Sequence, residues 1–328
     1  MSSGSEAHSE RLCVPPITRG GRADGGRVRR RVSLLTDDGV RIEAAYEPRA
    51  ARTGLSDGRV GAGGEGTAEE AAIVLAHGFT GSLHRRAVQR AARAFAQHAA
   101  VITFSFRGHG RSGGRSTVGD REVLDLAAAV RWARSLGHAR VATVGFSMGG
   151  SVVIRHAALY RPGGADGGPW EHEGCGEGEE HKRGEYEGRG ERAEAHADAV
   201  VAVSAPARWY YRGTAPMRRV HWVISGRMGR LVGRYGLRTR IHHKDWDPVP
   251  LSPVEAVPLI APTPFLVVHG DRDPYFPLDH PRSLADAAPD DVILWIEPGL
   301  GHAENAAEPG LLHRIGDWLA TAGRQPTS

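Results

Sequence analysis

One serine lies in a sequence context that suits a nucleophile. Ser147 is the central residue of GFSMG, a G-x-S-x-G motif that follows an apolar segment at 141–144 and precedes a helical pattern at 149–160. A strand, a sharp turn and a helix in this order lift a serine hydroxyl above a sheet, and the flanking glycines leave room for neighbouring backbone. Because a serine hydroxyl is a poor nucleophile at neutral pH, it also needs a base and a carboxylate that orients the base.

Candidates for the base and the carboxylate lie in loops that follow later apolar segments. His302 comes directly after the last predicted strand, and we expect it to act as the base for Ser147. Asp271 and Asp273 both follow the predicted strand at 265–268, and one of them should orient His302. The chain order Ser, Asp, His differs from the orders in chymotrypsin and subtilisin. Three histidines beside glycines at strand ends are expected to brace loops: His77, His109 and His269.

Apolar runs that alternate with helical patterns indicate which elements position these residues. A hairpin is expected first, around the turn at 37–39. From residue 71 onward the repeated unit predicts a doubly wound, mostly parallel α/β sheet with helices on both faces. The predicted strands are residues 73–75, 101–106, 141–144, 199–203, 265–268 and 292–296. The predicted helices are residues 83–97, 120–136, 149–160 and 309–321.

Composition divides the chain into a core and three additions. Residues 1–28 lack a hydrophobic period and predict a flexible N-terminal tail. Residues 161–197 hold ten glycines and ten acidic residues with almost nothing to bury, which predicts a disordered Gly/Glu-rich insertion. Residues 208–258 mix aromatic, aliphatic and basic side chains and predict a small helical cap, or lid. The predicted core segments are residues 29–160, a strand within 198–207, and residues 259–323.

Five short motifs occur in a defined order: HGFTG at 77–81, RGHGRS at 107–112, GFSMG at 145–149, HGDRDPYFP at 269–277 and GH at 301–302. Together they make the chain resemble the α/β-hydrolases, near the serine esterase, monoacylglycerol lipase and S33-like group. The resemblance covers most of residues 29–322.

Three features depart from that family's pattern. Ser105 stands where relatives often have an aspartate, and the 161–197 insertion has no recognisable counterpart. The HGFTG motif replaces the prolyl-peptidase signature His-Gly-Gly-Pro-Gly, which argues against an aminopeptidase.

The resemblance implies roles for further groups. In the family's H-G-x-x-D-x-x-x-P pattern the triad acid falls on Asp273, and Asp271 is left to shape the turn. The family's oxyanion hole falls on the backbone N–H groups of Phe79 and Met148. The tetrahedral intermediate carries a negative oxygen, and N–H groups that already face this oxygen stabilise it.

These residues predict a serine hydrolase that cleaves a carboxylic ester or thioester through a Ser-His-Asp triad and an acyl-enzyme. His302 must be neutral to accept the proton of Ser147, so activity is expected to fall as the pH drops. Three alternatives stay open: an acyltransferase, a peptidase of the same fold, and a ligand-binding homologue without turnover, since fold alone does not fix activity. An aspartate nucleophile would indicate a dehalogenase or an epoxide hydrolase, and Ser147 argues against both.

The expected partner is a small ester or thioester held by aromatic side chains. The cap aromatics either line an apolar acyl pocket or fill the core of the cap itself. Residues 208–244 carry ten basic and no acidic residues, which either attract an anionic substrate or membrane surface or form a solvated face. The pocket residues predicted are Trp209, Tyr210, Trp222, Tyr275 and Phe276.

Composition argues against several other classes of protein. The 328 residues include 42 basic and 38 acidic ones, without a helix-turn-helix or an aromatic-bearing basic module, so no nucleic-acid partner is expected. Cys13 and Cys175 offer no disulfide framework or zinc cluster, and no cofactor or metal is expected. No signal-like segment is recognisable, and the longest uncharged apolar run, residues 141–154, is too short to span a bilayer, so a cytoplasmic location is expected.

Overall fold

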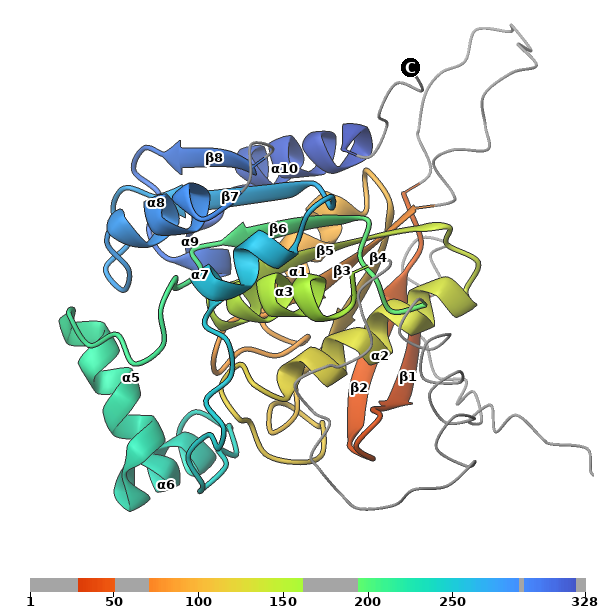
Figure 1. Ribbon diagram of the computed structural model, residues 1–328. Helices are drawn as coiled ribbons and strands as arrows, with labels where there is room; N and C mark the ends of the chain where they lie inside the picture. The colour runs from red at the N-terminus through yellow and green to blue at the C-terminus, as the bar shows by residue number, and fades with distance from the viewer. Residues whose placement is uncertain (1–28, 51–70, 162–193, 289–291, 323–328) are drawn as a thin grey trace, which may run out of the picture.

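The computed structural model describes residues 29–50, 71–161, 194–288 and 292–322. These residues include eight strands, which form one sheet in the order β1-β2-β4-β3-β5-β6-β7-β8 (Figure 1). The β1–β2 and β2–β4 pairs are antiparallel and the other neighbours are parallel, which confirms the predicted mostly parallel α/β fold. The strands are β1 Arg30–Leu35, β2 Arg41–Glu47, β3 Ala71–Ala76, β4 Ala100–Phe104, β5 Arg140–Phe146, β6 Ala199–Val203, β7 Phe265–Gly270 and β8 Val292–Glu297.

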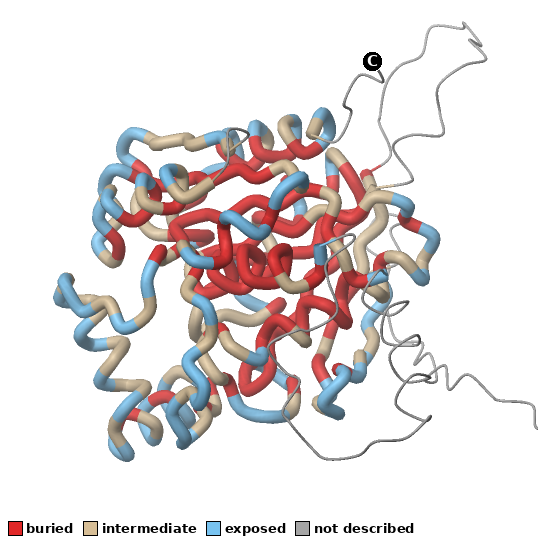
Figure 2. The backbone as a smooth tube through the Cα atoms, viewed as in Figure 1, coloured by how far each residue is buried: buried red, intermediate tan, exposed pale blue. Residues whose placement is uncertain are grey.

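Helices cover both faces of this sheet. The described helices are α1 Arg86–Phe95, α2 Glu122–Ser135, α3 Met148–Leu159, α5 Ala215–Ser225, α6 Arg227–Tyr235, α7 Pro253–Ala256, α8 Asp279–Asp286, α9 Ala303–Ala306 and α10 Pro309–Thr321. Of these, α5 and α6 lie apart from the two faces of the sheet (Figure 1). One hydrophobic cluster joins the sheet to α2, α3, α7 and α8, and a second joins it to α1, α9 and α10. Buried residues therefore concentrate in the central strands and in the helices against them, as Figure 2 shows.

Burial explains why apolar runs predict the central strands. Every residue of β4, β6 and β7 is buried, because helices lie on both sides of these strands. At one edge, β1 and β2 form the expected hairpin, in which the N–H of Thr36 donates to the carbonyl oxygen of Val40 at 2.9 Å. Gly39 in this turn has φ of 77°, a conformation that favours glycine.

Two predicted segment boundaries are wrong, because residues assigned to the additions are packed in the core. Ala195 and Ala197 are buried, so residues 194–197 do not belong to a loose insertion. At the other boundary, Ala256 of α7 and the following Val257 belong to the hydrophobic cluster beneath the sheet, so the cap ends before them. The predicted tail at 1–28 and the insertion between 162 and 193 lie outside the described residues. None of the described helices has the length and apolar character needed to cross a membrane.

One buried histidine predicts a loss of stability in acid. His156 of α3 is fully buried and stacks on Tyr160 with ring centroids 4.7 Å apart. Burial, and then the charges of Arg131 and His196, lower the pKa of His156 to about 3. The unfolded chain therefore binds the proton first as the pH falls below the ordinary value near 6.5, and stability is lost from there down to the folded pKa.

Replacing this imidazole should weaken the dependence of stability on pH. We expect His156→Leu to reduce the loss in unfolding free energy between pH 7 and pH 4 by about 3 kcal/mol relative to the wild type. Urea denaturation followed by circular dichroism at the two pH values measures the difference. The exposed His243→Leu variant is the control and should keep the wild-type dependence. An unchanged dependence in His156→Leu would contradict the prediction.

Candidate active site

The predicted turn at Ser147 joins the end of β5 to the start of α3. Ser147 has φ of 52° and ψ of −114°, a strained conformation for a residue with a side chain. A Cβ on Gly145 would overlap the carbonyl oxygen of Gly149, and a Cβ on Gly149 would overlap that of Ala76 in β3. Both positions of the motif therefore require glycine, and the hydroxyl of Ser147 is held above the carboxyl edge of the sheet.

Three side chains from distant parts of the chain meet at this edge. The Nε2 atom of His302 lies 2.9 Å from the Oγ atom of Ser147. On the other side of the ring, Nδ1 of His302 donates to Oδ2 of Asp273 at 2.7 Å. With the Nδ1 proton held by the carboxylate, Nε2 is left to accept the serine proton, the arrangement that nucleophilic catalysis by serine requires.

The structure separates the two candidate carboxylates. Besides His302, the side chain of Asp273 accepts the backbone N–H groups of Tyr275 at 2.8 Å and Phe276 at 3.2 Å. Burial alone would raise the pKa of Asp273, but these hydrogen bonds and the nearby imidazole outweigh burial and lower it. Asp271 is exposed and accepts the N–H of Gly299 at 2.6 Å. Asp273 therefore contacts the imidazole, and Asp271 braces the loop before His302.

The two backbone groups expected to form an oxyanion hole line one cavity with the serine. Phe79, Met148 and Ser147 all border this cavity. Met148 is the first residue of α3, where N–H groups have no partner within the helix and the helix dipole favours negative charge. Phe79 follows β3 in a turn closed by a 2.9 Å hydrogen bond from the N–H of Gly81 to the carbonyl oxygen of Gly78. Both residues thus border the same cavity as Ser147.

Buried histidines fix the turn that carries Phe79. His77 donates through Nδ1 to the carbonyl oxygen of Gly78 and accepts the N–H of Phe106 on Nε2, at 2.7 and 3.1 Å. His109 accepts the N–H of Thr80 on Nε2 at 3.3 Å. Burial, then the neighbouring His109, lower the pKa of His77 to about 3, so this ring is neutral at neutral pH. These contacts support the predicted bracing role, and His269 likewise donates to the carbonyl oxygen of Phe276 at 2.8 Å.

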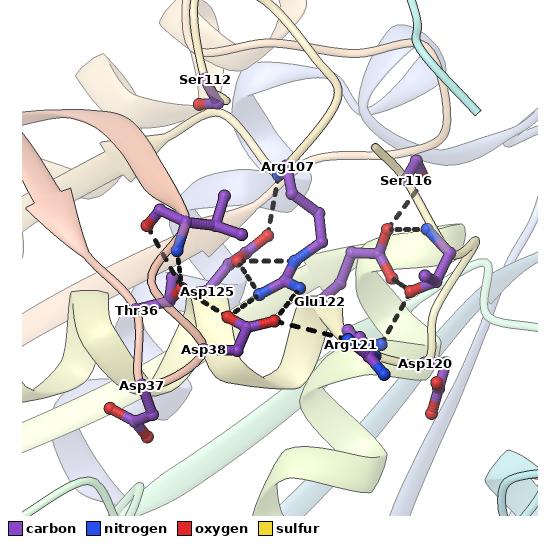
Figure 3. Close-up of polar contacts among 12 residues, drawn as sticks. Thr36, Asp37, Asp38, Arg107, Ser112, Ser116, Asp120, Arg121, Glu122 and Asp125 are labelled. Atoms are coloured by element: carbon purple, nitrogen blue, oxygen red, sulfur yellow. Dashed lines mark hydrogen bonds and ion pairs between the residues drawn. The ribbon is translucent and has the colours of Figure 1, made fainter. Parts of the chain in front are cut away.

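A buried ion network holds the loop between β4 and α2 (Figure 3). Arg107 is 2% exposed, and its guanidinium donates to Asp125 at 2.7 and 2.9 Å and to Asp38 at 2.6 and 3.0 Å. Glu122 accepts hydrogen bonds from three residues of the same loop. The loop also contributes Thr117 to the cavity beside Ser147, so the network supports one wall of the site. The donors to Glu122 are Ser116, Thr117 and Gly119.

Removing the central cation should destabilise the fold strongly. We expect Arg107→Leu to lower the free energy of unfolding by about 3–5 kcal/mol, because it leaves the fully buried carboxylate of Asp125 without a cation. Arg121→Leu is the matched control, since Arg121 also faces Asp38, at 4.0 Å, but its side chain is 58% exposed. An exposed pair contributes about 0–1 kcal/mol. Urea denaturation compares the two variants, and equal losses would refute the role of the buried pair.

A cavity of about 890 Å³ opens over the serine, between the carboxyl edge of the sheet and the helices α5 and α6. Tyr275 stacks on His302 with ring centroids 4.2 Å apart. Trp222 does not line the cavity, contrary to the sequence prediction, because helical spacing places it on the side of α5 opposite Val220 and Ile224, which do line it. The predicted pocket residues that do line the cavity are Trp209, Tyr210, Tyr275 and Phe276.

One acidic residue of this site escapes sequence analysis. Glu304 is 6% exposed and lines the cavity two residues after His302. Its Oε1 atom accepts the N–H of Gly78 at 3.1 Å. Burial raises the pKa of the Glu304 carboxyl. The signal in the sequence is weak, because a single glutamate in a short helix ordinarily lies on the surface.

Comparison with known proteins agrees with this fold. A family model described as alpha/beta hydrolase fold matches residues 71–165. A monoacylglycerol lipase from Mycolicibacterium smegmatis is 28% identical over 250 residues, which cover 70% of this chain and 80% of that protein. The esterase Pf2001 from Pyrococcus furiosus superimposes with a TM-score of 0.60 at 19% identity, over 94% of this chain and 97% of the other. The alpha/beta hydrolase GrgF from Penicillium sp. sh18 gives 0.58 at 16% identity, over 91% and 100%. The fold is that of the α/β-hydrolases.

Proposed function

We propose that this chain, an α/β-hydrolase of the esterase and lipase type, hydrolyses carboxylic esters or thioesters through an acyl-enzyme on Ser147. The observation that carries the proposal is the hydrogen-bonded series from Ser147 through His302 to Asp273, with distances of 2.9 and 2.7 Å. A nucleophile, a base and an orienting carboxylate within hydrogen-bond reach are the signature of this chemistry.

The proposed first half-reaction acylates the serine. The hydroxyl proton of Ser147 moves to Nε2 of His302 while Oγ attacks the carbonyl carbon of the substrate, and the carbonyl oxygen becomes negative. Backbone N–H groups of Phe79 and Met148 would hold that oxygen. The imidazolium, stabilised by Asp273, then gives the proton to the departing alcohol or thiol as the carbon–oxygen or carbon–sulfur bond breaks.

The second half-reaction returns the enzyme to its starting state. Nε2 of His302 takes a proton from a water molecule, whose oxygen attacks the acyl carbon attached to Ser147. Collapse of the second tetrahedral intermediate transfers the proton to Oγ and releases the carboxylic acid. An alcohol in place of this water would make the same site an acyltransferase, so product analysis with and without an added alcohol separates the two activities.

The cavity supports a substrate with an apolar acyl or alcohol portion. Its volume of about 890 Å³ falls within the range of small-molecule sites, roughly 300–1,000 Å³. The wall next to Ser147 is aromatic on one side, and α5 adds aliphatic side chains on the other. The relative from Mycolicibacterium smegmatis is a monoacylglycerol lipase, which is consistent with an apolar chain in this position. The α5 side chains concerned are Met217, Val220 and Ile224.

A series of p-nitrophenyl esters from acetate to palmitate, together with matching thioesters and 1-monoacylglycerols, tests this function. We expect turnover that rises with acyl length until the cavity is filled, because each buried methylene adds roughly 0.8 kcal/mol of transfer free energy. Ser135→Ala, which removes an exposed serine remote from the cavity, is the control for Ser147→Ala and should keep the wild-type turnover. Ligand-induced thermal shifts without turnover of any ester would support the binding-protein alternative instead.

A further inference from the structure

One face of α6 is apolar and uncovered. Four of its side chains recur at positions i, i+3, i+4 and i+7 and therefore share one face of the helix. The exposed fractions are 66% for Met228, 48% for Leu231, 44% for Val232 and 72% for Tyr235. A helix of a globular protein ordinarily turns such an apolar face to the core. Here that face is on the surface, where a contiguous apolar patch marks an interaction site.

The packing of α6 explains why the apolar face points outward. Gly229 and Gly233 are the buried residues of this helix. A Cβ on Gly229 would overlap the carbonyl oxygen of Trp222 in α5, and a Cβ on Gly233 would lie 3.1 Å from Cδ1 of Ile241. The helix thus contacts α5 and the 239–241 segment through its glycines, and its apolar face can turn inward only if the two helices separate.

The remaining face of α6 is basic. Arg227, Arg230 and Arg234 recur at i, i+3 and i+7 beside the apolar face. They belong to the 208–244 segment, which contains ten basic residues and no acidic one. Within the described part of the chain, Arg208 alone of these ten is paired with a carboxylate. The segment therefore combines exposed apolar surface with a strong excess of positive charge.

We propose that α6, together with the adjoining α5, is a docking surface for an anionic lipid bilayer. An amphipathic helix with an apolar face beside arginines lies in the plane of a bilayer surface, with its apolar side chains below the headgroups and its cations near the lipid phosphates. A second copy of this chain is a poor occupant, because a symmetric contact would bring two sets of ten cations together.

The position of the two helices relates this surface to the cavity. Figure 1 shows α5 and α6 at one corner of the molecule, away from the helices that cover the two faces of the sheet. Because α5 lines the cavity over Ser147, a bilayer held by α6 would lie next to the site. Lipid binding by this surface does not require that Ser147 be catalytic, so the inference goes beyond the proposed function.

Vesicle co-sedimentation of the full chain tests the docking surface. We expect binding to phosphatidylcholine vesicles containing 30% phosphatidylglycerol, and at least about tenfold weaker binding to phosphatidylcholine alone or at 0.5 M salt. The triple variant Met228→Ser, Leu231→Ser and Val232→Ser should bind the anionic vesicles at least about tenfold more weakly. Leu35→Ser, which removes a 61% exposed leucine on β1, is the matched control and should bind like the wild type.

The outcomes separate a failure of docking from a failure of folding or of catalysis. Thermal unfolding and turnover of a soluble short-chain ester should be the same in the triple variant as in the wild type, because the substituted side chains are exposed. Three results would overturn the proposal: no binding to anionic vesicles, equal binding by the triple variant, or wild-type dimers in light scattering that the triple variant converts to monomers. The last result would assign the surface to a second copy of the chain.

A second inference rests on Glu304 and is independent of the first. Its carboxyl lies under the turn that carries Phe79: a Cβ on Gly78 would come within 3.2 Å of both carboxyl oxygens and 3.4 Å of Cβ of Ser147. The side chain belongs to α9, which begins directly after His302. On the other side, Arg90 of α1 donates to the carbonyl oxygen of Glu304 at 2.6 Å. One residue thus joins the loop of the base to the loop of the oxyanion amide.

We infer that Glu304 is a positioning residue, which orients the Phe79 amide by accepting the preceding N–H of Gly78 and so ties that amide to the loop of His302. The inference rests on the proposed function, since it assigns a role within the same reaction. Loss of the acceptor should act on kcat, because the oxyanion donor is needed in the transition state and not in substrate binding.

Two substitutions at this position, measured on a soluble ester, test the inference. We expect Glu304→Ala to lower kcat by about 10–100-fold with KM within about twofold, and Glu304→Gln to restore most of the rate, because its amide oxygen also accepts a hydrogen bond. Glu308→Ala, at the exposed start of α10, is the control. A wild-type kcat in Glu304→Ala, or a Gln variant as slow as the Ala variant at equal thermal stability, would overturn the inference. If the wild type itself hydrolysed no ester, the result would contradict the proposed function instead.

Discussion

Substitution of Ser147 by alanine should lower kcat for ester hydrolysis by roughly 10⁴- to 10⁶-fold, the range expected when a triad serine is removed. The size follows from the geometry, because the only hydroxyl within 2.9 Å of Nε2 of His302 among the described residues is that of Ser147. Without it no acyl-enzyme forms, and the oxyanion amides can assist only direct attack by water. The stability of the fold should change little, since the flanking glycines and β5 are untouched.

Covalent labelling measures this prediction without knowledge of the substrate. The purified chain is treated with a fluorophosphonate, and the modified peptide is located by mass spectrometry. We expect one modified residue, Ser147, and loss of labelling in both Ser147→Ala and His302→Ala, because the serine needs its base to react. Ser135→Ala should label like the wild type. Labelling of another serine, or full labelling of His302→Ala, would refute the assignment.

The sequence predicts the nucleophile and the base because each is set by its local surroundings. Ser147 is recognised by two glycines whose Cβ atoms would overlap backbone, and His302 by its place after the last parallel strand. The central strands are equally local, since a strand buried on both faces is a short, continuous apolar run. The order of the strands in the sheet is not local, and the position of β4 between β2 and β3 becomes visible only in the structure.

The features that sequence analysis missed depend on contacts between distant segments. Glu304 is buried, and its carboxylate accepts the N–H of Gly78 from a loop more than 200 positions earlier. Trp222 is an aromatic residue like those that line the cavity, yet it lies on the other side of α5 and is 55% exposed. The sequence predicts the end of the cap too far along the chain, because α7 is a single turn and is too short to show a helical period.

Asp273 and Asp271 lie in one motif, and contacts with other segments tell them apart. The second large expected effect is that of replacing Asp273, but not Asp271, by asparagine. We expect Asp273→Asn to lower kcat by roughly 10³- to 10⁴-fold, because an amide no longer fixes the proton on Nδ1 of His302, and Nε2 ceases to be the acceptor for Ser147. Asp271→Asn should stay within about threefold of the wild type, since an amide oxygen can still accept the N–H of Gly299.

Steady-state kinetics of the two variants on one soluble ester, with thermal unfolding as a check of the fold, measures the difference. The pKa of Asp273 is held below its ordinary value, so its carboxylate is ionised throughout a pH range of 6 to 9. The loss of kcat in Asp273→Asn should therefore persist from pH 6 to pH 9. A substitution that only shifted the pH profile of the base would instead leave kcat near the wild-type value at one end of this range. A larger loss in Asp271→Asn than in Asp273→Asn would reverse the assignment of the orienting acid. Two carboxylates two residues apart are alike in sequence, and what distinguishes them is that the N–H groups of Tyr275 and Phe276 hold one of them against the imidazole.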